Sequence, residues 1–568
     1  MAIVVFRRRD GLARECSLRI TSGDLRTPVL LPTDGALVSP RPDARMLSHA
    51  SPAEAGAALT DVPSFRFTAH SPAAIARPLA QRNADLLAAA DGPTSLGHLH
   101  LTQHNDLLDL QLNALYDSGV PVAWIRNPDE LTGADLIRKL MVVKESLPDV
   151  ILIASTKRFE LIPFLVMCGV DVFDPVPLSL EPARGRMLHD LAPLAVDEPK
   201  DKLRTDTMAS ISRTLDLLRA AVRAGTVRET VEGYCARDVE AMRTLRLWDL
   251  ADTSRFADRA KASPQRFVLA ASLGRPEVVR WERDIRERYT PPSLSVLLLL
   301  PCSYTKPYSR SRTHQAVREA IGRPGSVHEV IVTSPLGAVP RELEGVYPAA
   351  HYDIPVTGTW STEEIDRSAS LVQNIIDKGA YERVMGYLPG SYGLVAAELA
   401  ARGVDVDVAT ELQALARLLP EDAHDERRAW GKEMSHAVLD IQFGPGTWSG
   451  LEPFHYRKGT LRHQDTRKRL AAIDPDTGLW ALNIAGARAM GDSPTHRVDI
   501  APFEFKASIF APGVMAAADG VQRGDDVIVF REGQLAAVGT AEMTGPEMVR
   551  SRRGLAITVR ERADEGGE

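Results

Sequence analysis

Short apolar runs alternate with helix-compatible stretches in two long parts of this chain, residues 1–190 and the region beyond Ser293. Residues 120–125 and 150–154 are typical of buried strands, and residues 135–145 between them have helical periodicity. Residues 169–177 continue the pattern with a further strand and its carboxyl-terminal loop. Such repeated units build parallel sheets whose functional groups lie at the carboxyl ends of the strands. The alternation therefore predicts a multidomain α/β protein, with a (β/α)-barrel in the first part.

A dense set of reactive side chains follows one apolar run. Residues 297–301 read Leu-Leu-Leu-Leu-Pro, a buried strand in pattern, and the loop after it is rich in polar groups. These groups are Cys302, Ser303, Tyr304, Lys306, Tyr308, Ser309, Ser311 and His314. One interpretation is an active-site loop at a strand's carboxyl end. The other is a strand, a turn and a helix cap in which Cys302 is a small buried hydrophobic residue.

The length and composition are those of a globular, multidomain protein. A length of 568 residues predicts three to four domains, and 44% hydrophobic with 25% charged residues is a globular composition. No apolar stretch approaches 18 residues, and Arg7 to Arg9 follow the first apolar run, the reverse of a secretory signal. The expectation is a soluble, cytoplasmic protein without a membrane partner.

The four cysteines, Cys16, Cys168, Cys235 and Cys302, lie far apart. They form neither the close pairs of a zinc site nor a disulfide framework. The sequence therefore predicts no metal site, and no cofactor is expected.

The net charge of −7 argues against indiscriminate coating of nucleic acid, but one surface needs only a few cations to bind phosphates. Residues 455–469 hold six cations against one acid, Asp465, and a second basic run surrounds Arg553. The alternative for both runs is an ordinary solvated face. The candidate RNA-binding residues are Arg457, Lys458, Arg462, Arg467, Lys468, Arg469 and Arg553.

The last part of the chain reads as small and all-β. Residues 524–530 and 535–539 flank the tight turn Glu532-Gly533. Together with residues 509–514 and 553–557, this stretch resembles a PUA domain, a small RNA-binding β-barrel. The resemblance covers residues 497–563.

The first 190 residues resemble a tRNA-guanine transglycosylase barrel. The similarity lies in Gly169-Val-Asp-Val-Phe-Asp174, Pro182-Ala-Arg-Gly-Arg186 and Thr27-Pro-Val-Leu-Leu-Pro32. It implies a (β/α)8 barrel in which Asp174 stands at the family's nucleophile position. The family's zinc cluster and its D-S-G-G-F-Q-type loop are both missing from the sequence. The expectation is thus a degenerate barrel that binds tRNA, with Asp174 as a substrate-binding or structural residue.

Pro301-Cys-Ser-Tyr-Thr-Lys-Pro-Tyr-Ser-Arg-Ser-Arg-Thr-His314 is similar to the signature of the archaeosine synthases, and residues 352–364 and 442–446 fit the same family. The order of parts agrees as well. The expected domains are a transglycosylase-like barrel with a helical extension (1–260), an α/β catalytic module (275–425), a small basic α+β module (430–495) and the PUA domain (497–563). The resemblance implies addition of an amine, lysine in the family, to the nitrile of the base preQ0 at position 15 in the D-arm of tRNA.

Addition to a nitrile needs a neutral amine, a proton donor and a pocket for a flat base. Cys302 is expected to attack first and form a thioimidate, with direct attack by the amine as the alternative. Lys306 is expected to stabilise an anion, His314 to shuttle a proton and Tyr308 to stack on the base or donate its hydroxyl. Ser303 is counted with this catalytic set. Asp353, Ser309 and Ser311 complete the expected site as substrate-binding residues, and Glu363 and Glu364 are either amine binders or the first turn of a helix.

Two other functions stay open on sequence alone. One is base exchange by the barrel through Asp174, and the other is a non-catalytic tRNA-binding subunit. The resemblance further implies tRNA and lysine as partners, a radical-SAM partner enzyme and a homodimer.

Overall fold

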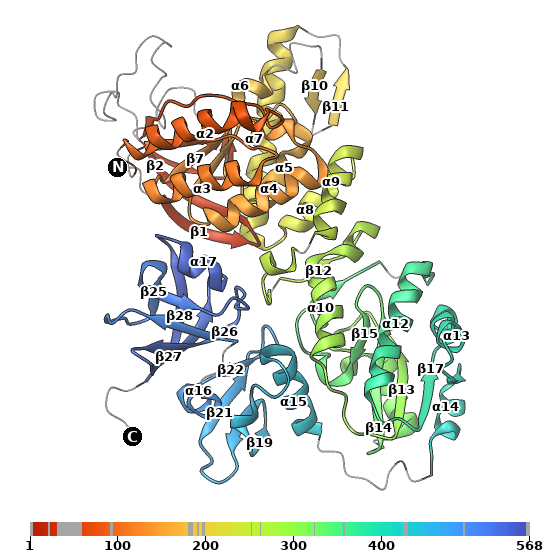
Figure 1. Ribbon diagram of the computed structural model, residues 1–568. Helices are drawn as coiled ribbons and strands as arrows, with labels where there is room; N and C mark the ends of the chain where they lie inside the picture. Colours follow the sequence, from red (N-terminus) through yellow and green to blue (C-terminus); the bar gives the residue numbers. More distant parts are fainter. Residues whose placement is uncertain are drawn as a thin grey trace. The chain divides into compact units, whose positions relative to one another are not determined.

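The computed structural model of the protein describes residues 4–20, 23–30, 59–90, 92, 95–179, 186–189, 192–195, 199–251, 253–261, 263–322, 324–355, 358–421, 423, 430–491 and 495–563. The chain forms two compact units (Figure 1). The first holds residues 1–256 with residues 510–512 and 546–555, and the second holds the rest.

A parallel six-stranded sheet in the order β4-β9-β8-β7-β6-β5 organises the first unit. Its strands are β4 (Val29–Leu30), β5 (Thr60–Asp61), β6 (Ser95–Leu99), β7 (Val122–Ile125), β8 (Ile151–Ala154) and β9 (Val172–Phe173). The helices between them are α2 (Ala73–Ala88), α3 (Asn105–Ser118), α4 (Gly133–Ser146) and α5 (Ile162–Met167). The β-α-β units expected around residues 120–177 are therefore present.

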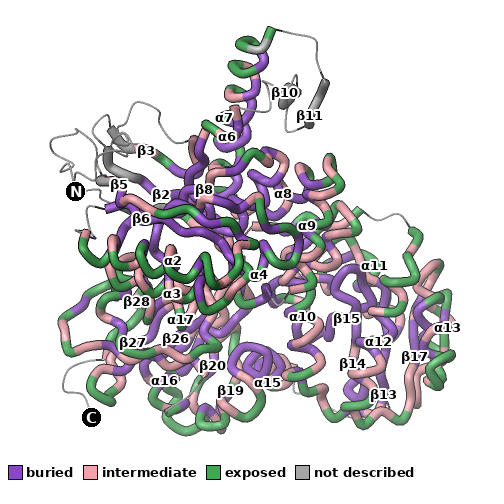
Figure 2. Tube along the Cα trace, turned by 45° about the horizontal axis from the view of Figure 1, so that its top comes forward, coloured by how far each residue is buried: buried purple, intermediate pink, exposed green. Residues whose placement is uncertain are grey.

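The two faces of this sheet pack differently, because successive side chains of a strand point to opposite sides. Ala123 and Ile125 join the core formed with the helices, whereas Val122 and Trp124 face a smaller cluster that includes Cys16 of β2 (Ala13–Ile20). Figure 2 shows β6 and β8 as buried throughout. Among the described residues the sheet has six strands and no pairing joins β4 to β5. A closed eight-stranded barrel thus stays a prediction.

Smaller elements complete the first unit. Strands β1 (Val4–Asp10), β2 and β3 (Gly23–Arg26) form an antiparallel sheet, and β10 (Arg186–His189) pairs with β11 (Ala192–Ala195). A short helix, α6 (Pro175–Leu178), follows β9. Three helices then follow, α7 (Lys200–Ala224), α8 (Val227–Cys235) and α9 (Val239–Leu250), where a helical extension is expected.

A five-stranded sheet in the order β15-β14-β13-β17-β18 lies at the centre of the second unit's first half. Its strands are β13 (Val296–Pro301), β14 (Val327–Thr333), β15 (Gly337–Pro340), β17 (Arg383–Tyr387) and β18 (Asp407–Ala409), and all but β15 run parallel. The helices are α10 (Pro276–Glu287), α11 (Arg312–Ile321), α12 (Thr362–Lys378), α13 (Gly393–Ala401) and α14 (Leu412–Leu418). The short strands β12 (Gln265–Arg266) and β16 (Tyr352–Asp353) pair beside it.

Helices cover both faces of this sheet. Leu298 and Leu300 of β13 belong to a core with Val317 of α11, whereas Leu297 and Leu299 belong to the core that includes α12 and α13. Burial on both faces explains why the strand reads as a continuous apolar run. The chain passes from β13 to β14 on one side and reaches β17 on the other side of β13. The carboxyl ends of β13 and β17 therefore mark the switch point where such folds bind ligands.

The rest of the second unit is a small α+β module followed by an all-β module. The first contains α15 (Trp430–Phe443), the antiparallel sheet β19 (Phe454–Arg457), β20 (Thr460–His463), β21 (Arg469–Ile473), β22 (Trp480–Leu482), and α16 (Ile484–Met490). The second is a six-stranded sheet of β23 (Arg497–Ile500), β24 (Ser508–Phe510), β25 (Val514–Ala517), β26 (Asp526–Arg531), β27 (Gln534–Ala541) and β28 (Leu555–Arg562). Helix α17 (Gly545–Arg550) follows β27, and from Pro546 on it belongs to the first unit. The hairpin expected at Glu532-Gly533 is confirmed, and both turn residues have positive φ, as its right-handed twist requires.

Within the part of the chain that the structure describes, no helix is both long enough and apolar enough to cross a membrane.

Candidate active site

Cys302 lies directly after β13, and Tyr392 lies in the loop that follows β17. The Cys302 sulfur and the Tyr392 hydroxyl oxygen are 3.0 Å apart, and both side chains are partly exposed. Gly390 precedes Tyr392 with φ +61°, a left-handed conformation that glycine adopts without strain. Burial and the nearby Cys302 raise the pKa of the Tyr392 phenol, so its hydroxyl keeps its proton near neutral pH.

Lys306 reaches the same place from the loop after Cys302. Its ammonium nitrogen lies 4.1 Å from the centre of the Tyr352 ring, a cation–π distance. Burial lowers the pKa of Lys306, and this effect is opposed by Cys302 and by Asp353, an exposed carboxylate. Among the described residues no hydrogen-bond acceptor holds this ammonium. Its proton is therefore easier to remove than that of a surface lysine.

Tyr308 is buried behind Tyr352, the residue whose ring holds the Lys306 ammonium. Its side chain is fully buried, and its hydroxyl oxygen lies 2.7 Å from that of Tyr352, which in turn lies 2.5 Å from the Thr333 hydroxyl. Burial raises the pKa of both phenols. A ring with no exposed face cannot stack on a base, so Tyr308 is not available for the stacking that the sequence suggested. It supports the ring of Tyr352 instead.

His314 lies in the first turn of α11 and is 2% exposed. Arg341 donates to its Nδ1 at 2.7 Å, so the other nitrogen, Nε2, carries the proton and donates to the carbonyl of Pro301 at 2.9 Å. Burial, followed by the charge of Arg341, lowers the pKa of His314 to about 4. Both ring nitrogens are occupied, and the arrangement ties the end of β13 to α11. This geometry favours a role for His314 in positioning the loop between β13 and α11 over a role in proton transfer.

The serines of the loop have local roles. Ser311 caps α11 by accepting from the backbone N–H of His314 at 3.2 Å, and Ser303 donates to the carbonyl of Thr305 at 3.0 Å. The backbone N–H of Ser309 donates to Glu344 at 2.9 Å. These bonds fix the course of the loop between β13 and α11.

Two aromatic residues of the cluster were missed by sequence reasoning. Tyr392 lies five residues beyond the end of β17, in a loop that sequence reasoning did not single out. Trp360 is partly exposed and packs edge-on against Tyr392, with ring centres 5.2 Å apart. A hydrogen bond from Ser391 to the carbonyl of Gly358 joins the two loops. The available sequence signal for Tyr392 was its position between two turn glycines, Gly390 and Gly393, shortly after an apolar run.

Asp174 lies at the carboxyl end of β9 in the first unit and is 8% exposed. One carboxylate oxygen accepts from the backbone N–H of Val176 at 3.0 Å and so caps α6, and the other accepts from Ser155 at 2.7 Å. Ser155 in turn accepts from the indole of Trp124 at 2.8 Å. Each carboxylate oxygen therefore already has a partner within this chain.

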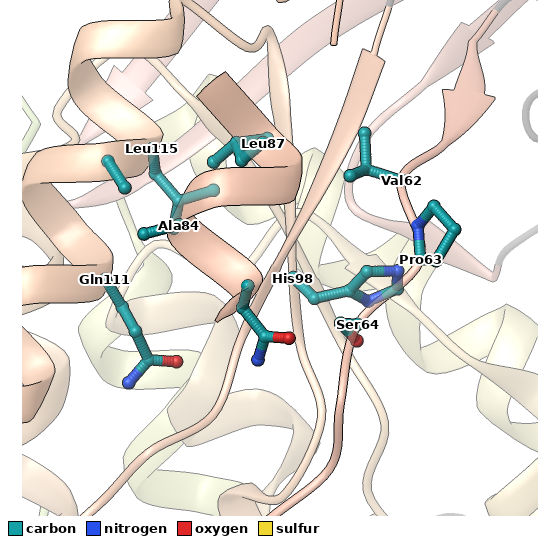
Figure 3. A pocket seen from close by; sticks show the side chains of 10 residues that line it. Val62, Pro63, Ser64, Ala84, Leu87, His98, Gln111 and Leu115 are labelled. Carbon is teal, nitrogen blue, oxygen red and sulfur yellow. The ribbon is translucent and has the colours of Figure 1, made fainter. Parts of the chain in front are cut away.

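His98 of β6 lies in the neighbouring part of the sheet and is paired with Asp61 at 2.5 Å. A cavity lined by His98, by residues 62–64 after β5 and by residues of α2 and α3 has a volume of about 10 Å³ (Figure 3). That is room for about one water molecule. This cavity is too small for a nucleobase.

The candidate RNA-binding residues of the second unit are all exposed on the sheet β19–β22 or its turns. His455, Arg462 and Arg469 are direct neighbours across three antiparallel strands, while Leu461 and Leu470 face the core. Like charges opposite one another destabilise a sheet, so this row is a surface suited to an anion. Arg457, Lys458, Arg467 and Lys468 lie at the two turns beside it. Arg553, in the first unit, is instead paired with Asp149 at 3.1 Å.

Comparison with known proteins gives the family. A domain of unknown function, DUF5591, matches residues 278–417, and the PUA domain matches residues 503–562. The archaeosine synthase subunit alpha of Methanosarcina acetivorans is 37% identical over 62% of this chain and 60% of its own length. That of Thermococcus kodakarensis is 31% identical over 75% of this chain and 78% of its own. The tRNA-guanine(15) transglycosylase of Methanothermobacter thermautotrophicus is 28% identical over 60% of this chain and 51% of its own.

The two family matches fall on the doubly wound sheet that carries Cys302 and on the carboxyl-terminal β-module, so the PUA resemblance is confirmed. The coverage of the Thermococcus relative extends the similarity to most of both chains. The chain belongs to the archaeosine synthase family.

Proposed function

We propose that this chain adds lysine to the nitrile of preQ0 at position 15 in the D-arm of tRNA, a step towards archaeosine. Membership of the family assigns a role in tRNA modification. The observation that carries the specific chemistry is the Cys302 and Tyr392 pair at the switch point of the sheet.

The nitrile carbon is the electrophile of this reaction. Cys302 attacks it, the C–S bond forms, and the nitrile nitrogen takes up the proton that the thiol gives up, which leaves a thioimidate. The lysine amine then attacks the same carbon, the C–S bond breaks, and a proton passes from the amine to the leaving sulfur. The product is an amidine, Cys302 is restored, and no electrons are exchanged. In the alternative route lysine attacks the nitrile directly.

Tyr392 is the proton donor of the first step. Its hydroxyl is 3.0 Å from the Cys302 sulfur and keeps its proton near neutral pH, so it can pass one proton on and receive another. Lys306 stabilises the thiolate because its ammonium is held on the ring of Tyr352 without a hydrogen-bond acceptor among the described residues. Asp353 is exposed beside it and is assigned to the incoming amine.

The flat base needs an aromatic surface, and Tyr308 is buried. Trp360, partly exposed against Tyr392, and Tyr304, which is 78% exposed, are the aromatic side chains assigned to this role. The exposed row on strands β19 to β21 and the PUA domain supply the contacts to the tRNA backbone.

Partners of the chain follow from the same proposal. Two of the relatives are named as an alpha subunit, and we assign to this chain a further subunit, a radical-SAM enzyme that completes archaeosine. We further propose that two copies of this chain form a homodimer, as the transglycosylase-like first unit suggests.

Base exchange through Asp174 is the alternative. Both of its carboxylate oxygens accept hydrogen bonds from this chain, and one of them caps α6. We therefore assign Asp174 a structural role. Release of guanine from unmodified tRNA, lost in Asp174→Asn, would reverse this assignment.

The test is nucleoside mass spectrometry of a preQ0-containing tRNA after incubation with the protein and lysine. The expected result is a mass gain of one lysine that Cys302→Ala abolishes and Cys235→Ala, which removes a thiol buried in the first unit, leaves in place. A mass gain that persists in Cys302→Ala would favour direct attack of the lysine amine on the nitrile. Tight tRNA binding without any gain would indicate a non-catalytic tRNA-binding subunit.

A further inference from the structure

Arg341 is a buried arginine beside the Cys302 loop, and no step of the proposed chemistry uses it. It directly follows the last residue of β15 and is 4% exposed. Its Nε donates to Glu329 at 2.7 Å, its Nη1 donates to Glu344 at 2.8 Å, and its Nη2 donates to Nδ1 of His314 at 2.7 Å. Burial of a charge is costly unless the charge is paired and hydrogen-bonded, so these three partners hold the guanidinium in one place.

One contact of Arg341 leads to the start of the Cys302 loop, residues 302–311. The His314 ring that accepts from Arg341 donates from its Nε2 to the Pro301 carbonyl at 2.9 Å. This carbonyl belongs to the peptide bond between Pro301 and Cys302. Because a peptide bond is planar, a fixed carbonyl also fixes the direction in which the Cys302 backbone continues. Arg341 therefore holds the first residue of the loop through His314.

A second contact of Arg341 leads to the other end of the loop. Oε2 of Glu344, which accepts from Arg341, also accepts from the backbone N–H of Ser309 at 2.9 Å. Ser309 lies two residues before Ser311, the residue that caps α11. One guanidinium thus connects both ends of the segment that carries Lys306.

We propose that Arg341 is a positioning residue, which holds both ends of the Cys302 loop and thereby places the Cys302 sulfur beside the Tyr392 hydroxyl. The inference rests on the proposed function, in which Tyr392 is the proton donor for the reaction at Cys302. A guanidinium suits this task because its donors form a rigid, planar fork that reaches several partners at fixed angles. The ammonium of a lysine carries the same charge but lacks the fork.

The first test is hydrogen exchange of the peptide that spans residues 302–311, followed by mass spectrometry. This peptide should exchange about tenfold faster in Arg341→Lys, while β17 keeps its wild-type exchange. The kcat of lysine addition should fall by about 10- to 100-fold, because a misplacement of about 1 Å can cost that much. KM for preQ0-tRNA should stay within about twofold of the wild type.

The matched control is Arg383→Lys at the amino end of β17. Arg383 donates to Asp407 at 2.6 Å and to the Leu418 carbonyl at 2.8 Å, so it also connects a carboxylate with the backbone. Parallel strands begin at the edge of the sheet opposite the one that carries Cys302. This control should keep the wild-type exchange of residues 302–311 and the wild-type kcat.

Glu344 offers a second pair of variants, which decides the question even if Arg341→Lys does not fold. Glu344→Gln keeps a side-chain oxygen for the Ser309 N–H, whereas Glu344→Ala removes it. The glutamine variant should keep the loop exchange and kcat of the wild type, and the alanine variant should change both in the direction of Arg341→Lys. The effects of Arg341→Lys and Glu344→Ala should not add in the double variant, because both release the same end of the loop.

Faster exchange spread evenly over β13, β14 and the loop would overturn the inference, because Arg341 would then stabilise the sheet as a whole. Unchanged loop exchange in Arg341→Lys, or equal losses in Glu344→Gln and Glu344→Ala, would overturn it as well. Absence of lysine addition in the wild type would contradict the proposed function instead. Hydrogen exchange would still decide whether Arg341 holds the loop, so the two failures are distinguishable.

Discussion

Cys302 and Tyr392 are 90 residues apart in the chain, and their side chains meet because β13 and β17 are neighbours in a parallel sheet. Parallel strands end at the same edge, so the two loops converge there. At the scale of residues, the proposed chemistry depends on the Cys302 sulfur, the Tyr392 hydroxyl and the Lys306 ammonium.

Tyr392→Phe removes only the hydroxyl that lies 3.0 Å from the Cys302 sulfur. We expect lysine addition to slow by about 10²- to 10⁴-fold, the usual contribution of a positioned proton donor. The tRNA dissociation constant should not change. Single-turnover mass spectrometry and a filter-binding assay measure the two quantities.

The matched control is Tyr387→Phe, which removes a phenol hydroxyl at the end of β17, the strand that precedes the Tyr392 loop. It should retain the wild-type rate. Loss of rate in both variants to the same extent would assign the effect to the strand rather than to the Tyr392 hydroxyl.

His314 makes the stability of this region depend on pH. Its pKa is lowered to about 4 in the folded protein by burial and by Arg341, against about 6.5 in an unfolded chain. Between these values the unfolded state binds more protons, so stability falls as the pH falls from 6.5 to 4. The slope for one such group is at most about 1.4 kcal/mol per pH unit.

His314→Gln keeps a side-chain N–H for the Pro301 carbonyl but cannot take up a proton. Hydrogen exchange of the β13 and α11 amides, followed by mass spectrometry, should show less acid destabilisation in the variant than in the wild type. Equal pH dependence in the two proteins would mean that His314 is not the group responsible. The rate of lysine addition above pH 6.5 should keep its pH profile.

At the scale of elements, the start of helix α12 shows whether Glu364 is free to bind an amine or belongs to the first turn of the helix. Glu364 accepts from the backbone N–H of Ser361 at 2.8 Å and donates its own N–H to the Ser361 hydroxyl at 3.2 Å. This reciprocal capping box begins the helix, so the first-turn interpretation of Glu364 is confirmed. The carboxylate also accepts from Ser334 at 2.6 Å, which leaves it little capacity for an amine.

The row of His455, Arg462 and Arg469 across β19 to β21 is expected to contact the phosphates of tRNA. Replacing Arg462 and Arg469 by alanine removes two neighbouring cations. We expect weaker tRNA binding. The slope of log affinity against log salt should also become smaller, by about one for each phosphate that the variant no longer neutralises.

Arg402→Ala is the control for this pair, because it removes an exposed arginine that is already paired with Asp366 and Glu398. It should leave the salt slope unchanged. A salt slope identical in the wild type and in the double variant would exclude the row from the tRNA interface.

At the scale of the whole molecule, the proposed function divides the chemistry and the tRNA binding between different modules. Cys302 belongs to the doubly wound sheet, whereas the basic row belongs to the small module that follows it. The Cys302→Ala variant should therefore lose kcat and keep its affinity for tRNA. The Arg462 and Arg469 double variant should raise KM while kcat stays within about twofold of the wild type. Steady-state kinetics with preQ0-tRNA distinguishes these patterns, and a matched fall of kcat in both variants would contradict the division.

A local pattern was sufficient for much of this fold. The apolar run 297–301 and the helix over residues 362–378 follow from periodicity and capping, since neighbouring residues create those signals. The hairpin at Glu532-Gly533 was predictable for the same reason. The motif that begins at Cys302 lies directly after this apolar run, at the carboxyl end of β13.

The tertiary structure alone decided which side chains meet there. Tyr308 and His314 stand in the same polar loop as Cys302, yet one is fully buried beneath Tyr352 and the other is held between Arg341 and Pro301. Tyr392 and Trp360 enter from elements far along the chain. The sequence by itself thus determined the family, many of the elements and the position of the polar loop after β13. Only the tertiary structure determined which of its side chains are buried and which lie next to one another, because both depend on which strands become neighbours.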